Sequence, residues 1–164
     1  MFLQIDAHID WRDERYGEKF GFSSTMRRAS EQAHVWRIVQ VGARGLGSAR
    51  EAEVRHAKQW GAHIFTSRHG LKDILDTIPP DSDCLITLDC DALDTSEMPA
   101  VAHPSPGGLT YMQVVDLIAG VAAKARIAGF TMVEFAPKKD RDGASAYTAA
   151  RIAANIIGHI ARQI

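Results

Sequence analysis

The stretch Cys84-Leu85-Ile86-Thr87-Leu88-Asp89-Cys90-Asp91-Ala92-Leu93-Asp94 is an apolar run that ends in three acidic residues. Four other short runs share its branched or aromatic character, at residues 2–5, 37–41, 63–66 and 131–135. Runs of this kind are typical of strands buried on both faces. Longer amphipathic segments separate them, so the order is strand, helix, strand throughout. This alternation predicts an α/β fold with a doubly wound parallel sheet in three α/β/α layers.

Three of the intervening segments carry clear helix patterns. Thr110 and Gln113 form a capping box ahead of an apolar stripe, and Ser48 and Glu51 repeat that pattern before a helix that Gly61 closes. A last helix is expected from about residue 145 to residue 160. No low-complexity linker divides the chain, so residues 1–164 are predicted to form a single domain.

Composition excludes several classes of partner. The chain of 164 residues has a formal net charge of -1, which gives no basic field for nucleic acid or a membrane surface. No apolar run approaches the ~20 residues that span a bilayer. Cys84 and Cys90 are expected to be reduced core thiols. Together with an N-terminus that lacks a basic region and a long apolar stretch, they predict a cytoplasmic location.

Two of the predicted strands end in an unusual concentration of acidic residues. The first runs into Asp6-Ala7-His8-Ile9-Asp10, and the fourth runs into Asp89 and Asp91. Residues two apart in an extended chain point to the same side. In doubly wound sheets, ligands bind beyond the carboxyl ends of the strands where the winding direction reverses. If these two strands are neighbours there, four carboxylates and one imidazole meet in a single crevice.

Four carboxylates in one crevice require compensation, because they repel one another and each is costly to desolvate. Two divalent cations would balance the four negative charges. Carboxylate oxygens with one imidazole suit manganese or magnesium. The absence of thiolate ligands from these motifs argues against a structural zinc site. The alternative is that strand-end aspartates only cap loops or helices, and for Asp94 this interpretation is preferred. The two motifs together favour a metal site.

Both acidic motifs resemble signatures of the ureohydrolase family, the arginases and agmatinases. Residues 6–10 are similar to Asp-Ala-His-x-Asp, and residues 87–95 are similar to Ser-x-Asp-x-Asp-x-x-Asp-Pro, with threonine at both ends. Pro106-Gly107-Gly108-Leu109-Thr110 and Val133-Glu134-Phe135-Ala136-Pro137 look like two further family segments in the expected order. Met26-Arg27-Arg28-Ala29 favours the agmatinase-like branch.

The resemblance implies a dinuclear manganese site. Asp6 and Asp89 would bridge the two Mn²⁺ ions, His8 and Asp91 would complete one site, and Asp10 would serve the other. It also implies the order fifth, fourth, first, second, third for the predicted strands, which leaves the fifth as a bare apolar edge. Such edges attract other chains, so a homo-oligomer is expected.

The reaction that the resemblance implies is hydrolysis of a guanidino compound, a linear amidine such as agmatine. A hydroxide between the metals would attack the guanidinium carbon and release urea and an amine. Asp10 would orient the hydroxide. Glu134 would bind the planar guanidinium through paired, charge-assisted hydrogen bonds.

The chain departs from the family in two places. Family members are longer at the N-terminus, where a Gly-Gly-Asp-His motif supplies a further histidine ligand; His103 is the best internal candidate to replace it. Phe22 stands where agmatinases usually carry a histidine. A truncated fragment and a natural half-length homologue both remain open. So does a catalytically inactive fragment or scaffold that lacks one metal ligand.

Two other functions are less favoured. A metal-dependent phosphohydrolase also uses clustered aspartates, but no phosphate-binding glycine loop is evident. The run from Gly42 to Gly47 has the spacing Gly-x-x-Gly-x-Gly rather than that of a dinucleotide site. It is interpreted instead as a tight turn into the helix predicted after Ser48.

Overall fold

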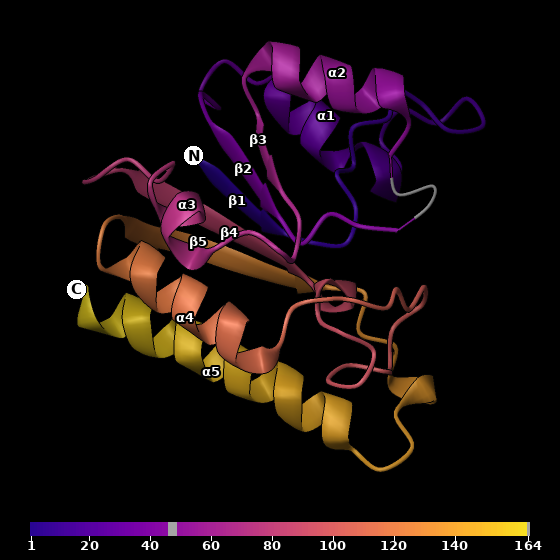
Figure 1. Ribbon diagram of the computed structural model, residues 1–164, viewed down its shortest axis with the longest axis vertical. Coiled ribbons are helices and arrows are strands. Elements are labelled where there is room, and N and C mark those ends of the chain that lie inside the picture. Colours follow the sequence, from indigo (N-terminus) through magenta and orange to yellow (C-terminus); the bar gives the residue numbers. More distant parts are fainter. Residues whose placement is uncertain (46–48, 164) are drawn as a thin grey trace.

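The computed structural model describes residues 1–45 and 49–163, which include five parallel strands (Figure 1). The strands lie in one sheet in the order β3-β2-β1-β4-β5. This is the strand order expected from the resemblance, and it confirms the doubly wound parallel sheet. The strands are β1 (Phe2–Ile5), β2 (Ile38–Val41), β3 (His63–Phe65), β4 (Asp83–Asp89) and β5 (Arg126–Val133).

Helices cover the two faces of the sheet unequally. Figure 1 shows α1 (Thr25–Ser30) and α2 (Glu51–Trp60) over β1 to β3 on one face. On the other face, α4 (Tyr111–Ala122) and α5 (Ala144–Arg162) lie along β4 and β5, and α3 (Leu71–Leu75) contacts α4. The chain therefore changes face between β3 and β4. Because β2 and β4 flank β1 and are reached over opposite faces, the boundary of β1 and β4 is the switch point.

The predicted helix starts are partly confirmed. Thr110 caps α4, since its hydroxyl accepts from the Gln113 backbone N–H while the Gln113 side chain accepts from the Thr110 backbone N–H. Gly61 ends α2 in a left-handed conformation, as expected. Ser48 lies outside the described residues. Arg50 occupies the N-cap of α2, and Glu53 accepts a hydrogen bond from its backbone N–H.

The fifth strand was predicted too far toward the C-terminus. It begins at Arg126 and ends at Val133, instead of spanning 131–135. Its first half contains a charge, alanine and glycine, so the apolar run that marks the other strands is missing there. Glu134 therefore follows the strand, with a positive φ of 63° that turns the chain away from the sheet.

The main core lies between the sheet and the pair α4 and α5. Val114, Ile118 and Val121 of α4 and Ile152 and Ile156 of α5 are buried there against β4. Two free cysteines, one in β4 and one directly after it, are also buried, as predicted. Burial on this scale stabilises the sheet by about 25 cal/mol per Å² of apolar surface. The core thus holds β4, and with it the second acidic motif, firmly in place.

The sheet ends at β5, which pairs with β4 on one side. Val133 in β5 is 46% exposed. Among the described residues, no helix combines the length and the apolar character that a bilayer crossing requires.

Candidate metal centre

The two acidic motifs follow neighbouring strands and meet at the carboxyl ends of those strands. β1 and β4 run parallel, with Ile5 paired to Leu88, so the residues after each strand leave the sheet side by side. The backbone N–H of Ala7 donates to Asp91 Oδ1 over 3.2 Å and ties the two motifs together. The prediction that the strand tips lie together is therefore confirmed.

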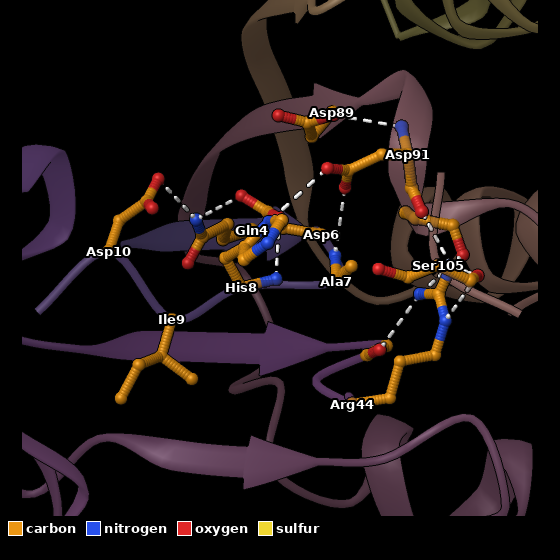
Figure 2. A network of polar contacts seen from close by, with 12 residues as sticks. Gln4, Asp6, Ala7, His8, Ile9, Asp10, Arg44, Asp89, Asp91 and Ser105 are labelled. Atoms are coloured by element: carbon orange, nitrogen blue, oxygen red, sulfur yellow. Dashed lines mark hydrogen bonds and ion pairs between the residues drawn. The ribbon is translucent and has the colours of Figure 1, made fainter. Parts of the chain in front are cut away.

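Asp6, His8 and Asp91 converge on one point (Figure 2). Each offers a ligand atom, and these atoms lie within 4.8 Å of one another. His8 Nδ1 lies 3.2 Å from Asp6 Oδ1 and 3.2 Å from Asp91 Oδ2. Two buried carboxylates and one half-buried imidazole form a donor set that fits a divalent cation with oxygen and nitrogen ligands.

Asp10 and Asp89 lie beside this group. Figure 2 shows Asp10 connected to Asp6 through the side chain of Gln4. Asp89 is 8% exposed, and its Oδ1 accepts from the Asp91 backbone N–H over 2.8 Å. Within the part of the chain that the structure describes, the tight three-residue group includes neither Asp10 nor Asp89. The five predicted metal ligands therefore lie together, but only three converge closely.

Local backbone structure places these side chains. Asp89 caps a 3-10 turn, Cys90–Ala92, which turns Asp91 back over the end of β1. After β1, the backbone N–H of His8 donates to Asp6 Oδ1 over 2.6 Å. Asp10 then adopts a left-handed φ of 49°, which redirects the chain. Aspartate tolerates this conformation better than most residues do.

The carboxyl groups of the cluster have strongly altered acidity. Burial, and then the charges of Asp6 and Asp91, raise the pKa of Asp89 to about 9. Burial and the charge of Asp6 raise the pKa of Asp10 to about 7, and burial raises the pKa of Asp6 as well. Burial is the largest cause of all three shifts, and the neighbouring carboxylates add to it. An added cation would relieve them.

His8 carries the positive charge that the protein itself supplies at this point. Hydrogen bonds from its ring to Asp6 and Asp91 raise its pKa to about 10. Burial alone would raise the pKa of Asp91, but the hydrogen bond and charge of His8 bring it below its usual value. A metal ion binds neutral imidazole, so a cation placed here would release the His8 proton.

Arg44 holds the backbone of the second acidic motif in place. Its guanidinium donates to backbone carbonyl oxygens on three segments, those of Gly42, Asp91, Ala92, Leu93 and Ser105, over 2.6 to 3.1 Å. Burial lowers the pKa of Arg44. The planar fork of arginine suits such a set of acceptors. The Asp91 turn is thereby fastened to the end of β2 and to the Ser105 loop (Figure 2).

Two glycines let neighbouring loops pack against the motifs. Gly42 has a φ of 106°, and a Cβ there would lie 2.9 Å from the Asp6 carbonyl oxygen. A Cβ on Gly108 would lie 2.4 Å from the backbone nitrogen of Asp94. Larger residues would push both loops off the acidic cluster.

The remaining sequence candidates separate into caps and exposed groups. Asp94 caps a loop, because its carboxylate accepts from Ser96, Gly107 and Gly108, and the Ser96 hydrogen bonds hold its pKa far below the usual range. His103 is exposed and is no member of the ligand group found in the described residues. Glu134 is exposed just beyond β5, on the same edge of the sheet as the acids.

Sequence reasoning overlooked two polar residues that hold the site. Gln4 contacts both Asp6 and Asp10, and Arg44 holds the Asp91 turn. A signal was present for Gln4, since a glutamine in the middle of an apolar strand is unusual and demands a partner. Arg44 lay in a glycine-rich turn where arginine is unremarkable.

Comparison with known proteins agrees with this geometry. The model of the Arginase family matches residues 1–158. The chain belongs to the arginase family. It is 37% identical over 138 residues to N(1)-aminopropylagmatine ureohydrolase of Thermus thermophilus, covering 82% of this chain and 46% of that protein. It is 29% identical to the agmatinase of Pyrococcus horikoshii, covering 98% of this chain and 56% of the relative.

Solved structures show the arginase-family fold over nearly the whole chain. Proclavaminate amidino hydrolase from Streptomyces clavuligerus superposes with a TM-score of 0.89 at 24% identity, over 98% of this chain and 56% of that one. Agmatine ureohydrolase of Thermoplasma volcanium gives a TM-score of 0.82 at 27% identity, over 97% and 54% of the two chains. This arginase-family chain thus spans about half the length of the relatives that it matches.

Proposed function

We propose that this protein binds two manganese ions between β1 and β4 and hydrolyses a guanidino compound to urea and an amine. One observation carries the proposal: three ligand residues converge, with two further acids beside them, at the switch point of an arginase-family fold. Burial and neighbouring carboxylates raise the pKa of these acids, so a bound cation would stabilise their charged forms. Agmatine and N1-aminopropylagmatine are the first substrates to test, since relatives are named for acting on them or as agmatinases.

In this proposal His8 and Asp91 would hold the first cation and Asp10 would hold the second. Asp6 and Asp89 would be shared by both. Such a pair of ions, when bound, supplies the Lewis acidity that makes water a nucleophile near neutral pH. His8 would bind as neutral imidazole through Nδ1, the atom that faces both carboxylates. Its displaced proton makes cation binding stronger as the pH rises.

Two acidic residues would handle the substrate. The Asp10 carboxylate lies beside Asp6, joined to it through Gln4, and would orient the attacking water and accept its proton. Glu134 lies exposed beyond β5, next to the end of β4. A carboxylate there would bind a planar guanidinium through two parallel hydrogen bonds.

A second candidate is a catalytically inactive member of the family that retains the fold and one cation. It is favoured by the close convergence of only three ligand residues in the described chain, and by the length of the chain relative to its relatives. The two candidates differ in what they bind: two cations with turnover, or one cation without it.

Metal counting and a urea assay distinguish the candidates. The chain, purified with chelator and reloaded with Mn²⁺, is expected to hold two ions and to release urea from a guanidino substrate. Asp89→Ala should lose at least one ion and all turnover, because a ligand shared by the two cations is gone. Asp116→Ala, on the exposed face of α4, is the matched control and should behave as wild type. One ion or none without urea would support the inactive candidate.

A further inference from the structure

A chain of buried amides connects the middle of the sheet to the acidic cluster. Gln4 of β1 and Gln40 of β2 lie opposite each other in the parallel register, and both are almost fully buried. Gln40 Nε2 donates to Gln4 Oε1 and, over 2.6 Å, to the carbonyl oxygen of Ile9. These two acceptors fix the orientation of the Gln40 amide, and Gln40 in turn fixes that of Gln4.

The amide nitrogen of Gln4 reaches two acids at once (Figure 2). Gln4 Nε2 lies 2.7 Å from Asp6 Oδ2 and 3.1 Å from Asp10 Oδ2. An amide nitrogen carries two hydrogens, so each carboxylate receives one. The Thr25 hydroxyl also donates to Asp10 Oδ2, over 2.9 Å. These bonds fix the rotation of the Asp10 carboxyl group and leave Oδ1 on the other side.

A simpler interpretation is that the two glutamines only satisfy each other inside the sheet. The bonding pattern argues against it. Both hydrogens of the Gln4 amide go to the acids and none to Gln40. Gln40 Oε1 is buried and finds no hydrogen-bond partner among the described residues. A pair selected for stability would not leave a buried acceptor unpaired, since apolar residues would fill this space at lower cost.

A neutral donor is also the chemistry that a cation site needs at this position. A lysine or arginine between Asp6 and Asp10 would neutralise them and compete with a metal ion. An apolar residue would leave two carboxylates free to rotate away from each other, as like charges do. The glutamine amide holds them close without adding a positive charge that would compete with a cation.

We infer that Gln4, oriented by Gln40, is a positioning residue of the metal centre that sets Asp6 and Asp10 at a fixed separation for the second cation. The inference rests on the proposed function for the identity of the bound ion. The arrangement of the two carboxylates is a property of the protein alone and can be tested separately.

The test uses Gln4→Met and Gln40→Met in the full chain, because methionine matches glutamine in length and removes the amide. Manganese binding is followed by calorimetry and by electron paramagnetic resonance, which detects the magnetic coupling of a close manganese pair. Gln4→Met is expected to retain the first cation, to weaken the second by about 10- to 100-fold, and to lose the coupled signal. Gln40→Met should show the same loss in smaller measure. Gln59→Met, exposed on α2, is the control.

Three results decide the inference. A folded Gln4→Met protein with two cations at wild-type affinity overturns it. If Gln4→Met does not fold, Gln40→Met decides by the same criterion, because it leaves the Gln4 amide in place but unanchored. If the wild type itself holds no cation pair, the proposed function fails, and crystal structures of wild type and Gln40→Met in chelator decide instead: an unchanged Asp10 carboxyl overturns the positioning role, and a rotated one supports it.

Discussion

A charged Asp10 is expected to favour cation binding but to lower the free energy of unfolding, and its shifted pKa makes this cost measurable. Burial and the charge of Asp6 raise its pKa from 3.8 to about 7. A carboxyl group with a raised pKa in the folded state favours folding fully at low pH, below about 4. That contribution is lost progressively as the pH rises to about 7. Asp10→Asn removes the titration while keeping the size and shape of the side chain.

The size of the effect follows from the shift. A difference of about three pKa units corresponds to about 4 kcal/mol of unfolding free energy at pH 8. Thr25 and Gln4 both donate to Asp10 Oδ2, so the amide oxygen of asparagine can accept both hydrogen bonds, and replacing a charged acceptor by a neutral one costs about 1 kcal/mol. In chelator, Asp10→Asn should therefore be more stable than wild type by about 3 kcal/mol at pH 8. At pH 5 the advantage should shrink to about 1 kcal/mol or less.

Urea denaturation in chelator at pH 5 and pH 8 measures this difference. Asp116→Asn, which removes an exposed acid from α4, should show no comparable change between the two pH values. Adding Mn²⁺ at pH 8 should reverse the order, because wild type then gains binding energy that Asp10→Asn lacks. If wild type is the more stable protein at pH 8 without metal, the account of uncompensated charge in the cluster is wrong.

Two further predictions concern the scaffold around the site. Arg44→Lys should lower the unfolding free energy by about 3 kcal/mol, since lysine cannot donate to carbonyl groups on three segments. The control Arg55→Lys, on the exposed side of α2, should change the unfolding free energy little. Equal losses in the two variants would contradict the role given to Arg44. We also propose that the chain self-associates through β5, so Thr131→Lys combined with Val133→Lys should shift it toward monomer in light scattering. A wild-type protein that stays monomeric at high micromolar concentration would refute this.

Most of the sheet was predictable because its strands are marked by apolar content. β1, β2, β3 and β4 were placed to within about two residues at each end, since continuous branched residues leave few alternatives. β5 was misplaced because half of it faces solvent and lacks that pattern. No bounds were predicted for α1, because it is one short, arginine-rich helix between loops with little amphipathic signal.

The position of the metal centre was predictable, but its internal geometry was not. Spacing placed Asp6 with His8 and Asp89 with Asp91, and the strand order brought the two pairs together. The left-handed turn at Asp10 breaks the two-residue alternation on which that spacing argument depends. Only the structure shows which donor then holds this carboxylate, because the donor comes from the interior of a strand.

The bond between Ala7 and Asp91 spans 84 positions of the chain, across the whole β2–β3 half of the sheet. Contacts that close such long loops form late, after local segments have ordered. During synthesis, a chain that has not yet reached residue 91 has only the first half of the acidic cluster and nothing to pair with it. Cation binding at this site would therefore require that β4 has already paired with β1. The nascent polypeptide would not bind a metal ion here before then.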